Sequence, residues 1–356
     1  MLPADGGRKG WDPRPFHVGI SGWRYPPWRG PFYPPGLPQR RELEYASRAL
    51  ASVEVNGSFY ALQRASSYAQ WREQTPAGFV FSVKGPRFVT HMKKLADVDV
   101  PLANFFASGV LSLGDQLGPL LWQLSPTMGF DAQRLARFFE LLPRTTRDAA
   151  RLATHHDYRL DGRAVTKTDA DRPLRHALEV RHRSFETTEF VQLLREHDIA
   201  LVCADTAGRW PLLDDVTSDF VYVRLHGDRE LYVSGYGDAA LDRWAARVRT
   251  WQLGGTPSDG RTLAAPAPIR EREVFVYFDN DAKVRAPFDA LALGHRLGLE
   301  PLIRSAAELP LPARAPPPDL AGPGLPDRTG QALSRPGPRA CGPGPGTPRR
   351  HGGCCL

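Results

Sequence analysis

Short apolar segments recur along the chain, and each ends at a polar or charged cluster. Eight such segments are Val18–Trp23, Ser52–Phe59, Phe79–Lys84, Leu120–Ser125, Ala177–His182, Ala200–Asp205, Phe220–His226 and Val274–Asp281. Helix-compatible stretches separate them, so strands and helices alternate. Such alternation over about 250 residues is typical of a closed parallel barrel, whose functional groups lie at the carboxyl ends of the strands. We therefore predict an α/β fold with a single TIM-like (β/α)8 parallel barrel.

Aliphatic and polar side chains alternate within these segments. Val53 and Val55, for example, alternate with Glu54 and Asn56. Residues i and i+2 of a strand share a face, and in a barrel one face packs under the helices while the other points inward. We expect the aliphatic face to lie under the helices and a charged set to point inward near one mouth. This set comprises Glu54, Lys84, Glu179, Arg181, Asp205, Arg224, His226 and Asp279.

We place the barrel at residues 16–312. Three segments do not follow its alternation of strands and helices, namely the two ends of the chain and one insertion within the barrel. Residues 1–15 are short and polar, and we expect a flexible N-terminus. Residues 144–175 form an insertion before the fifth strand, with a helix through Ala153 and a turn at Asp161-Gly162. Residues 313–356 are rich in proline, glycine and arginine and lack apolar periodicity, so we expect a disordered tail.

Apolar residues at helical spacing predict helices at Pro38–Leu50, Asp131–Leu142 and Asp238–Trp251. Asp238 is expected to be the N-cap of the last of these. We interpret their apolar faces as core and not as cofactor sites.

The net charge gives little support for a nucleic-acid partner. Six arginines and two aspartates between residues 313 and 356 supply +4 of the formal charge of +7. The rest of the chain carries only +3, which makes no electrostatic case for nucleic acid, since that partner requires a clustered basic face. A nucleic-acid partner is therefore not the leading expectation. No apolar run is long enough to cross a membrane. Only Cys203 lies in the barrel, so we expect a reducing, cytoplasmic location and no membrane partner.

Several motifs resemble those of the YecE-like proteins, the domain-of-unknown-function family seventy-two. They are Gly22–Pro34, Val53–Tyr60, Phe81–Lys84 with Thr90-His91, Gln123–Pro126, Glu179–His182 with Ser184-Phe185, Tyr222–Gly227 and Tyr277–Asp281. Ser125 and Phe185 stand where that family commonly has proline and tryptophan. The resemblance spans residues 18–297 and implies a TIM-like barrel. It brings no established reaction.

The charged set contains groups suited to binding an anion. The planar guanidinium groups of Arg181 and Arg224 match a carboxylate or phosphate, and Lys84 adds a point charge. Glu54 is the candidate base because its neighbour Asn56 is neutral, and His226 is the candidate acid. Glu179 and Asp205 complete the candidate catalytic residues. The near-balanced charges also fit a network that only fixes the barrel register, and this alternative stays open.

Further candidates for substrate binding are polar or aromatic. Asn56, Gln123 and His91 lie at or beyond strand ends. Trp23, Tyr25 and Trp28 belong to an aromatic, proline-rich loop after the first strand, which serves either as a packed lid or as a surface that stacks a sugar or base.

A divalent metal is left open, and no other cofactor is expected. Asp279 and Asp281 are secondary candidates for binding a hard cation, but strand-end aspartates more often cap the next helix. Cys341, His351, Cys354 and Cys355 match no zinc spacing.

The leading hypothesis is an enzyme that performs acid–base chemistry on a polar, anionic small molecule or a sugar phosphate at the carboxyl-terminal mouth. One alternative is a metal-assisted phosphodiester hydrolase. Another is a non-catalytic binder of nucleic acid or of a metabolite. The substrate and the oligomeric state are not specified by the sequence.

Overall fold

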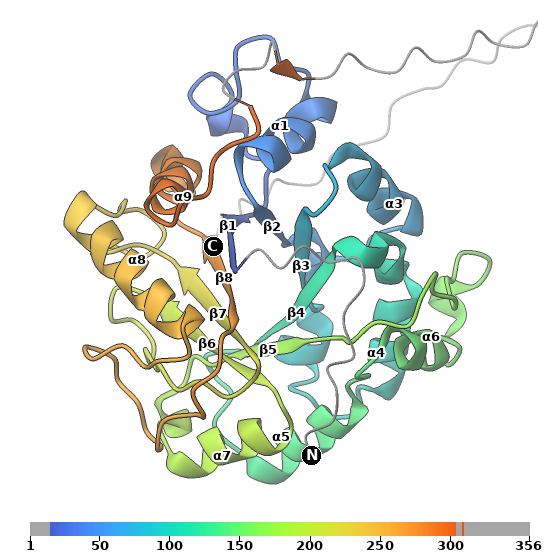
Figure 1. The fold of residues 1–356 in the computed structure, drawn as a ribbon. Helices are drawn as coiled ribbons and strands as arrows, with labels where there is room; N and C mark the ends of the chain where they lie inside the picture. Colours follow the sequence, from blue (N-terminus) through green and yellow to red (C-terminus); the bar gives the residue numbers. More distant parts are fainter. Residues whose placement is uncertain (1–14, 304–307, 310–356) are drawn as a thin grey trace, which may run out of the picture. The chain divides into compact units, whose positions relative to one another are not determined.

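Parallel strands β1 to β8 follow one another around a closed barrel in chain order (Figure 1). The computed structural model describes residues 15–303 and 308–309, which belong to one compact unit. The strands are β1 Phe16–Ser21, β2 Ser52–Val55, β3 Val80–Lys84, β4 Leu117–Gln123, β5 His176–Glu179, β6 Ala200–Asp205, β7 Phe220–Leu225 and β8 Glu273–Phe278. The predicted (β/α)8 barrel is confirmed.

Several predicted segments run past the ends of the strands. The segment predicted at Ser52–Phe59 contains the short strand β2, and helix α2 begins at Gly57. Likewise, β8 ends at Phe278, so Asp279 and Asp281 lie in the loop beyond it. At both strands the pattern of polar and apolar side chains does not mark where pairing ends, so the predicted segments include the residues just beyond the last paired one.

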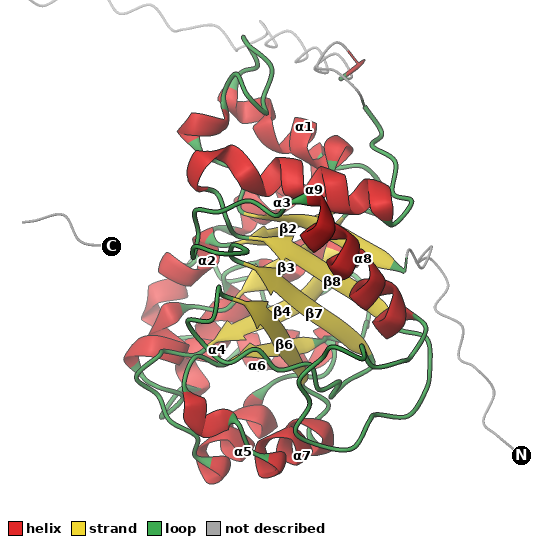
Figure 2. Ribbon diagram, turned by 90° about the vertical axis from the view of Figure 1, so that its left-hand side faces the viewer, coloured by secondary structure: helices red, strands yellow, loops and turns green. Residues whose placement is uncertain are grey.

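Helices surround the strands in Figure 1, and Figure 2 shows α1, α3 and α9 on one side of the barrel and α5 and α7 on the other. Their bounds are α1 Glu42–Ala49, α2 Gly57–Tyr60, α3 Ala65–Gln74, α4 Asp99–Ala107, α5 Ala132–Leu141, α6 Thr146–Ala153, α7 Thr188–Glu196, α8 Asp238–Gln252 and α9 Arg285–Arg296. No described helix is long and apolar enough to span a bilayer.

The predicted helices are present, with one correction at α8. Asp131 caps α5 by accepting a hydrogen bond of 3.0 Å from the Arg134 amide. At α8 the N-cap is Gly237 and not Asp238. Asp238 is instead the first helical residue and its carboxylate pairs with Arg296 at 2.7 Å, so the prediction of an Asp238 cap is wrong.

The segment 144–175 contains α6, which packs against α4, and a 3₁₀ turn at Tyr158–Leu160. A turn follows at residues 161–163, where Gly162 has φ +73. The helix through Ala153 and the Asp161-Gly162 turn are therefore confirmed. The predicted flexible N-terminus, apart from Pro15, and the predicted disordered tail lie outside the described residues.

The alternation of side chains has the predicted orientation. Val53, Val55, Phe81 and Val83 belong to the large cluster that packs with the helices. A separate buried cluster fills the barrel interior and contains Val80, Leu121, Ala177, Ala200, Val202, Ala204, Phe220, Tyr222, Phe275 and Tyr277.

Two tyrosines cross this interior and bond to serines of other strands. The hydroxyl of Tyr277 lies 2.7 Å from Ser52 Oγ, and that of Tyr222 lies 2.7 Å from Ser82 Oγ. Aliphatic residues usually fill this part of a TIM barrel. Here the tyrosines form a hydrogen-bonded floor beneath the charged residues.

Candidate functional site

Arg224, on β7, is the centre of the charged network. Its guanidinium contacts three carboxylates: Glu54 at 2.9 and 3.0 Å, Glu179 at 2.7 Å and Asp279 at 2.9 Å. Arg224, Glu54 and Glu179 have no solvent exposure. The structure thus brings together four residues that the sequence predicts for the mouth, and it buries three of them completely.

Both oxygens of Glu54 are fully engaged. Besides Arg224, the Tyr222 hydroxyl donates to Oε2 at 2.7 Å, and the Ser21 hydroxyl donates to Oε1. Asn56 in turn donates to Ser21 Oγ at 2.7 Å. Glu54 therefore holds Arg224 in place and offers no free oxygen to a ligand.

Glu179 has a similar set of partners. Gln123, at the end of β4, donates to Oε2 at 2.9 Å, and Arg181 Nε donates to Oε1 at 2.8 Å. Burial alone would raise the pKa of Glu179, but Arg181 and Arg224 outweigh that effect and hold it well below its usual range. Glu179 is thus a stable anion shared by two guanidinium groups.

His226 is also held on both ring nitrogens. Its Nδ1 lies 3.1 Å from Asp279 Oδ2, and its Nε2 lies 3.3 Å from Arg224 Nη1. Burial and the charge of Arg224 lower the pKa of His226, although Asp279 opposes them. The ring is therefore neutral near pH 7, and its Nε2 accepts from Arg224.

Lys84, the last residue of β3, differs from the rest of the network. Its side chain is 7% exposed, and its Nζ lies 4.3 Å from the centre of the Phe59 ring. Among the described residues, none gives this ammonium a hydrogen bond or a carboxylate within 4.0 Å. Burial and Arg224 lower the pKa of Lys84 from 10.5 to about 8, against the attraction of Glu54.

His91 also contacts Phe59, edge to face. It belongs to a π-helical turn, Phe88–Met92, and the two ring centres are 5.1 Å apart. Its Nδ1 lies 3.0 Å from the Thr90 hydroxyl. Burial and the charge of Lys84 lower the pKa of His91 to about 4, so the ring is neutral. Single π-helical turns are rare in proteins as a whole, and those that occur are often found at functional sites.

Arg181 stacks on an aromatic residue that the sequence did not single out. Its guanidinium carbon lies 3.9 Å from the centre of the Trp210 ring, and Nη2 lies 3.4 Å from the Tyr232 hydroxyl. Both aromatics lie in the loops that follow β6 and β7. Their position just after strand ends was the signal that could have identified them.

The aromatic loop after β1 is largely packed inside the protein. Trp28 has no exposure, and Trp23 is 6% exposed with its ring edge-on to Trp71. Neither ring has a face available to a ligand, so the packed alternative is correct for both. Tyr25 is half-buried and donates to the Ser21 carbonyl at 2.7 Å.

Asp205 does not join the network. Its strand neighbours Leu201 and Cys203 pack on the helix side, and its carboxylate accepts from the Tyr236 hydroxyl at 3.0 Å. The prediction that Asp205 points inward is wrong, because strand β6 presents Ala204 to the interior instead. A one-residue step along a strand reverses the face.

Asp281 stands at the N-cap position of a 3₁₀ turn, Ala282–Val284, but its side chain makes no capping hydrogen bond. Asp279 bonds to Arg224 and His226 instead, so capping is the wrong interpretation for both aspartates. Burial and the neighbouring Asp279 raise the pKa of Asp281 to about 6. Within the described residues, no group of three or more His, Cys, Asp or Glu side chains is arranged to hold a metal.

Backbone strain is concentrated around the same end of the barrel. Among the described non-glycine residues with positive φ, all except Asp198 lie in connections that follow the carboxyl ends of strands. They are Lys94, Leu95, Asp97, Ala207, Tyr232, Lys283 and Val284. Such strain persists where surrounding contacts enforce it, and it clusters at functional sites.

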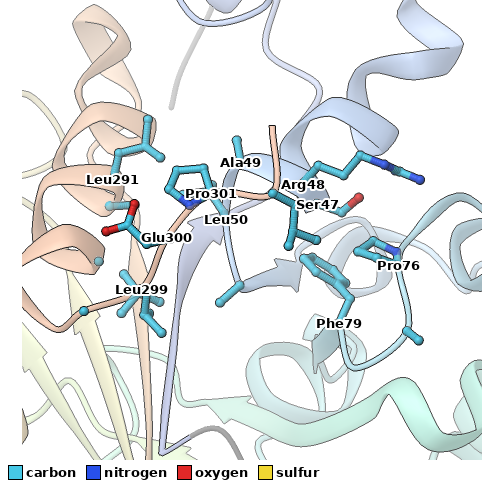
Figure 3. Close-up of a pocket in the computed structure, with 17 residues that line it drawn as sticks. Ser47, Arg48, Ala49, Leu50, Pro76, Phe79, Leu291, Leu299, Glu300 and Pro301 are labelled. Carbon is cyan, nitrogen blue, oxygen red and sulfur yellow. The ribbon is translucent and has the colours of Figure 1, made fainter. Parts of the chain in front are cut away.

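Two pockets lie at the opposite, amino-terminal end. One pocket, of about 270 Å³, is lined mainly by apolar side chains (Figure 3). They come from the end of α1 and its link to β2, from the residues just before β3, and from α9 and the segment that follows it. The other, of about 840 Å³, contains Arg144, Arg172 and Arg175. These arginines already donate to the His197 carbonyl, Asp169 and Glu273. Because barrel chemistry lies at the carboxyl ends of strands, the charged mouth is the candidate site.

Known proteins resemble this chain in both sequence and fold. The UPF0759 protein YecE of Escherichia coli is 30% identical over 128 residues, which cover 36% of this chain and 44% of YecE. The UPF0759 protein YunF of Bacillus subtilis is 32% identical over 74 residues, 21% of this chain and 25% of YunF. The chain thus matches less than half of the length of these relatives.

Solved structures extend the likeness across the barrel. The DUF72 family protein of Thermotoga maritima has a TM-score of 0.59 and 23% identity, over 80% of this chain and 99% of that one. A DUF72 family protein of Enterococcus faecalis has a TM-score of 0.56 and 16% identity, over 80% and 96%. The family model described as "Protein of unknown function DUF72" matches residues 17–314. The chain therefore belongs to the DUF72 family, as its motifs predict.

Proposed function

We propose that the carboxyl-terminal mouth of the barrel is the active site of an enzyme that performs acid–base chemistry on a polar, anionic small molecule such as a sugar phosphate. One observation carries the proposal: Lys84 is a buried ammonium for which the described residues offer no counter-ion within 4.0 Å. An unpaired buried charge costs several kcal/mol, and an anionic ligand removes that cost.

Arg181 supplies the second contact for the anion. Its Nε is bonded to Glu179, but the side chain remains 10% exposed and its Nη1 has no described hydrogen-bond partner. Both Lys84 and Arg181 act electrostatically on His91 and on Glu179. We place the anion between these two cations, where a carboxylate or phosphate satisfies both.

The contacts favour His91 and Asp281 as the groups that move protons, in place of Glu54 and His226. Both Glu54 oxygens are already bonded within the buried network, and the His226 ring lies fully buried between Arg224 and Asp279. His91 is neutral near pH 7 and half-buried, and Asp281 has its pKa raised to about 6. The raised pKa of Asp281 lies closer to neutrality, which suits general acid–base catalysis. The neutral ring of His91 is able to accept a proton from a substrate.

The other candidate functions receive less support from the described residues. A metal-assisted hydrolase needs a cluster of ligands that these residues do not form. A metabolite binder without catalysis would use the same contacts with Lys84 and Arg181, and absence of turnover with every ligand that binds would identify it.

Thermal unfolding with a panel of anions tests the proposal. Phosphate, glucose 6-phosphate and citrate are compared with uncharged glucose, for wild type, Lys84→Met and Lys84→Arg. A ligand at one hundred times its Kd adds about 2.7 kcal/mol, equivalent to a rise of roughly 5–10 °C.

We expect that rise for wild type with at least one anion, a smaller rise for Lys84→Arg and none for Lys84→Met. Glucose should have no effect on any of the three. An equal response of wild type and Lys84→Met to every anion would contradict the proposal.

A further inference from the structure

Lys84 has the surroundings of a reactive amine. The Phe59 ring covers one side of Nζ at 4.3 Å, and no described side chain or carbonyl accepts a hydrogen bond from it. Arg224, a neighbouring cation of the mouth, is bonded to three carboxylates. It is therefore not available to bind the ligand atoms that contact Lys84. An amine that is buried, unbonded and next to a fixed cation is the arrangement in which lysine acts as a nucleophile.

We propose that Lys84 forms an imine with an aldehyde or ketone substrate that carries a carboxylate or phosphate, the negative group being held by Arg181. This inference rests on the proposed function, because it places the same anion in the same mouth. It adds the reacting atom and the chemical class of the substrate.

Lysine supplies something that the surrounding arginines cannot. A guanidinium stays protonated at any physiological pH, whereas an amine can lose its proton and attack a carbonyl carbon. The chain has few lysines, namely Lys9, Lys84, Lys93, Lys94, Lys167 and Lys283. Of these, Lys84 alone among the described ones is buried; Lys93 lies exposed on the same connection.

The protonation state of Lys84 supports the same role. Its pKa is lowered to about 8 by burial and by Arg224. About half of the Lys84 side chains are then free amines at pH 8, against less than about 1% for an ordinary lysine. The charged form is still present to attract the anion.

The step balances without an added oxidant or reductant. The ammonium form of Lys84 gives one proton to His91, and the freed lone pair attacks the carbonyl carbon while the carbonyl π electrons move to the oxygen. One of the two protons left on the nitrogen then passes to that oxygen, which gives a neutral carbinolamine. The nitrogen lone pair expels the hydroxyl group as water, with the proton that His91 holds, and leaves a protonated imine. His91 is suited to this transfer because its ring and the Lys84 ammonium both contact Phe59, and the charge of Lys84 acts on His91.

Reductive trapping tests the inference on the full chain. Protein at pH 8 is incubated with pyruvate or glyoxylate and cyanoborohydride, which transfers hydride to the imine carbon and leaves a stable secondary amine. Intact mass and chymotryptic peptides then locate the adduct. Lys84→Arg, which keeps the charge but not the nucleophile, is the matched variant, and exposed Lys93 is the internal control.

We expect labelling of Lys84 to be at least tenfold faster than labelling of Lys93, to be absent in Lys84→Arg, and to be slowed by phosphate. Uncharged acetone should label Lys84 at least tenfold more slowly than pyruvate. Equal labelling of Lys84 and Lys93 would overturn the imine, even if the anions raise the melting temperature through Lys84. In that case the proposed binding of an anion would remain and only the imine would be rejected. If no anion raises the melting temperature through Lys84, the proposed function itself is contradicted.

Discussion

Arg224 and Glu54 form a two-pronged ion pair across the barrel, with Nε 3.0 Å from Oε2 and Nη2 2.9 Å from Oε1. Neither side chain has any exposure to solvent. Breaking an ion pair with this geometry and burial strongly destabilises the folded protein, because removal of one partner leaves the other charge unpaired in a low-dielectric interior.

Replacement of Arg224 by Met should therefore lower the free energy of unfolding by about 3–5 kcal/mol, measured by urea denaturation. Three carboxylates lose their shared cation in this variant. Arg181→Met, which removes one ion pair at a partly exposed position, should cost less. Similar losses for the two variants would show that Arg224 is not the centre of the network.

The pH dependence of stability should report the state of Lys84. Its pKa is about 8 in the folded protein, below the 10.5 of an unfolded chain. Between these values the unfolded state holds a proton that the folded state has released, so this group makes stability rise with pH. Below pH 8 both states are protonated and the cost of burying the charge is fully present.

The measurement is the free energy of unfolding from pH 7 to 10 for wild type and Lys84→Met. The difference between the two proteins should favour the variant at pH 7 and shrink as the pH rises. Lys93→Met, at an exposed position, is the control and should follow wild type. Parallel curves for wild type and Lys84→Met would contradict the lowered pKa.

Phe59→Leu should lower the pKa of Lys84 further. The aromatic face 4.3 Å from Nζ stabilises the ammonium by about 1–2 kcal/mol when water is excluded, which is roughly one pKa unit. The midpoint of the pH profile for reductive labelling of Lys84 measures the shift. An unchanged midpoint would mean that the ring contact does not stabilise the charged form.

His91→Gln should slow imine formation without weakening the binding of anions. General acid–base groups commonly contribute about 10²–10⁴-fold in rate. The rate of adduct formation should therefore fall at least tenfold, while the melting-temperature rise caused by phosphate stays the same. A loss of both effects would assign His91 to binding, and a loss of neither would remove it from the mechanism.

The sequence predicted the barrel and the composition of the mouth because the side-chain alternation of parallel strands is strict. Glu54, Glu179 and Arg224 follow aliphatic residues in a period of two, and all three point inward as that period requires. The predicted orientation of Asp205 was wrong because both faces of β6 are apolar, so the alternation did not indicate which face Asp205 is on.

Contacts made at long range could not be predicted in the same way. Trp28 looked available for a ligand, but Phe32 and Tyr33 pack around it and bury it completely. The absence of a described carboxylate partner for Lys84 could not be predicted either, because it depends on which carboxylates pair with the arginines in the folded barrel. Sequence spacing gives the direction of a side chain, whereas its partners are set by the closed structure.

The tyrosine floor and the ion pairs above it join residues that are far apart in the chain. Tyr222 bonds to Ser82 across 140 positions, and Arg224 reaches Glu54 across 170. During synthesis, the strands that carry Glu54 and Glu179 leave the ribosome before the strand that carries their cation has been made. Until β7 arrives, closing those strands would bury Glu54 without Arg224 and would leave Glu179 with Arg181 alone. We therefore expect the ring to close only after β7, Phe220–Leu225, has been translated.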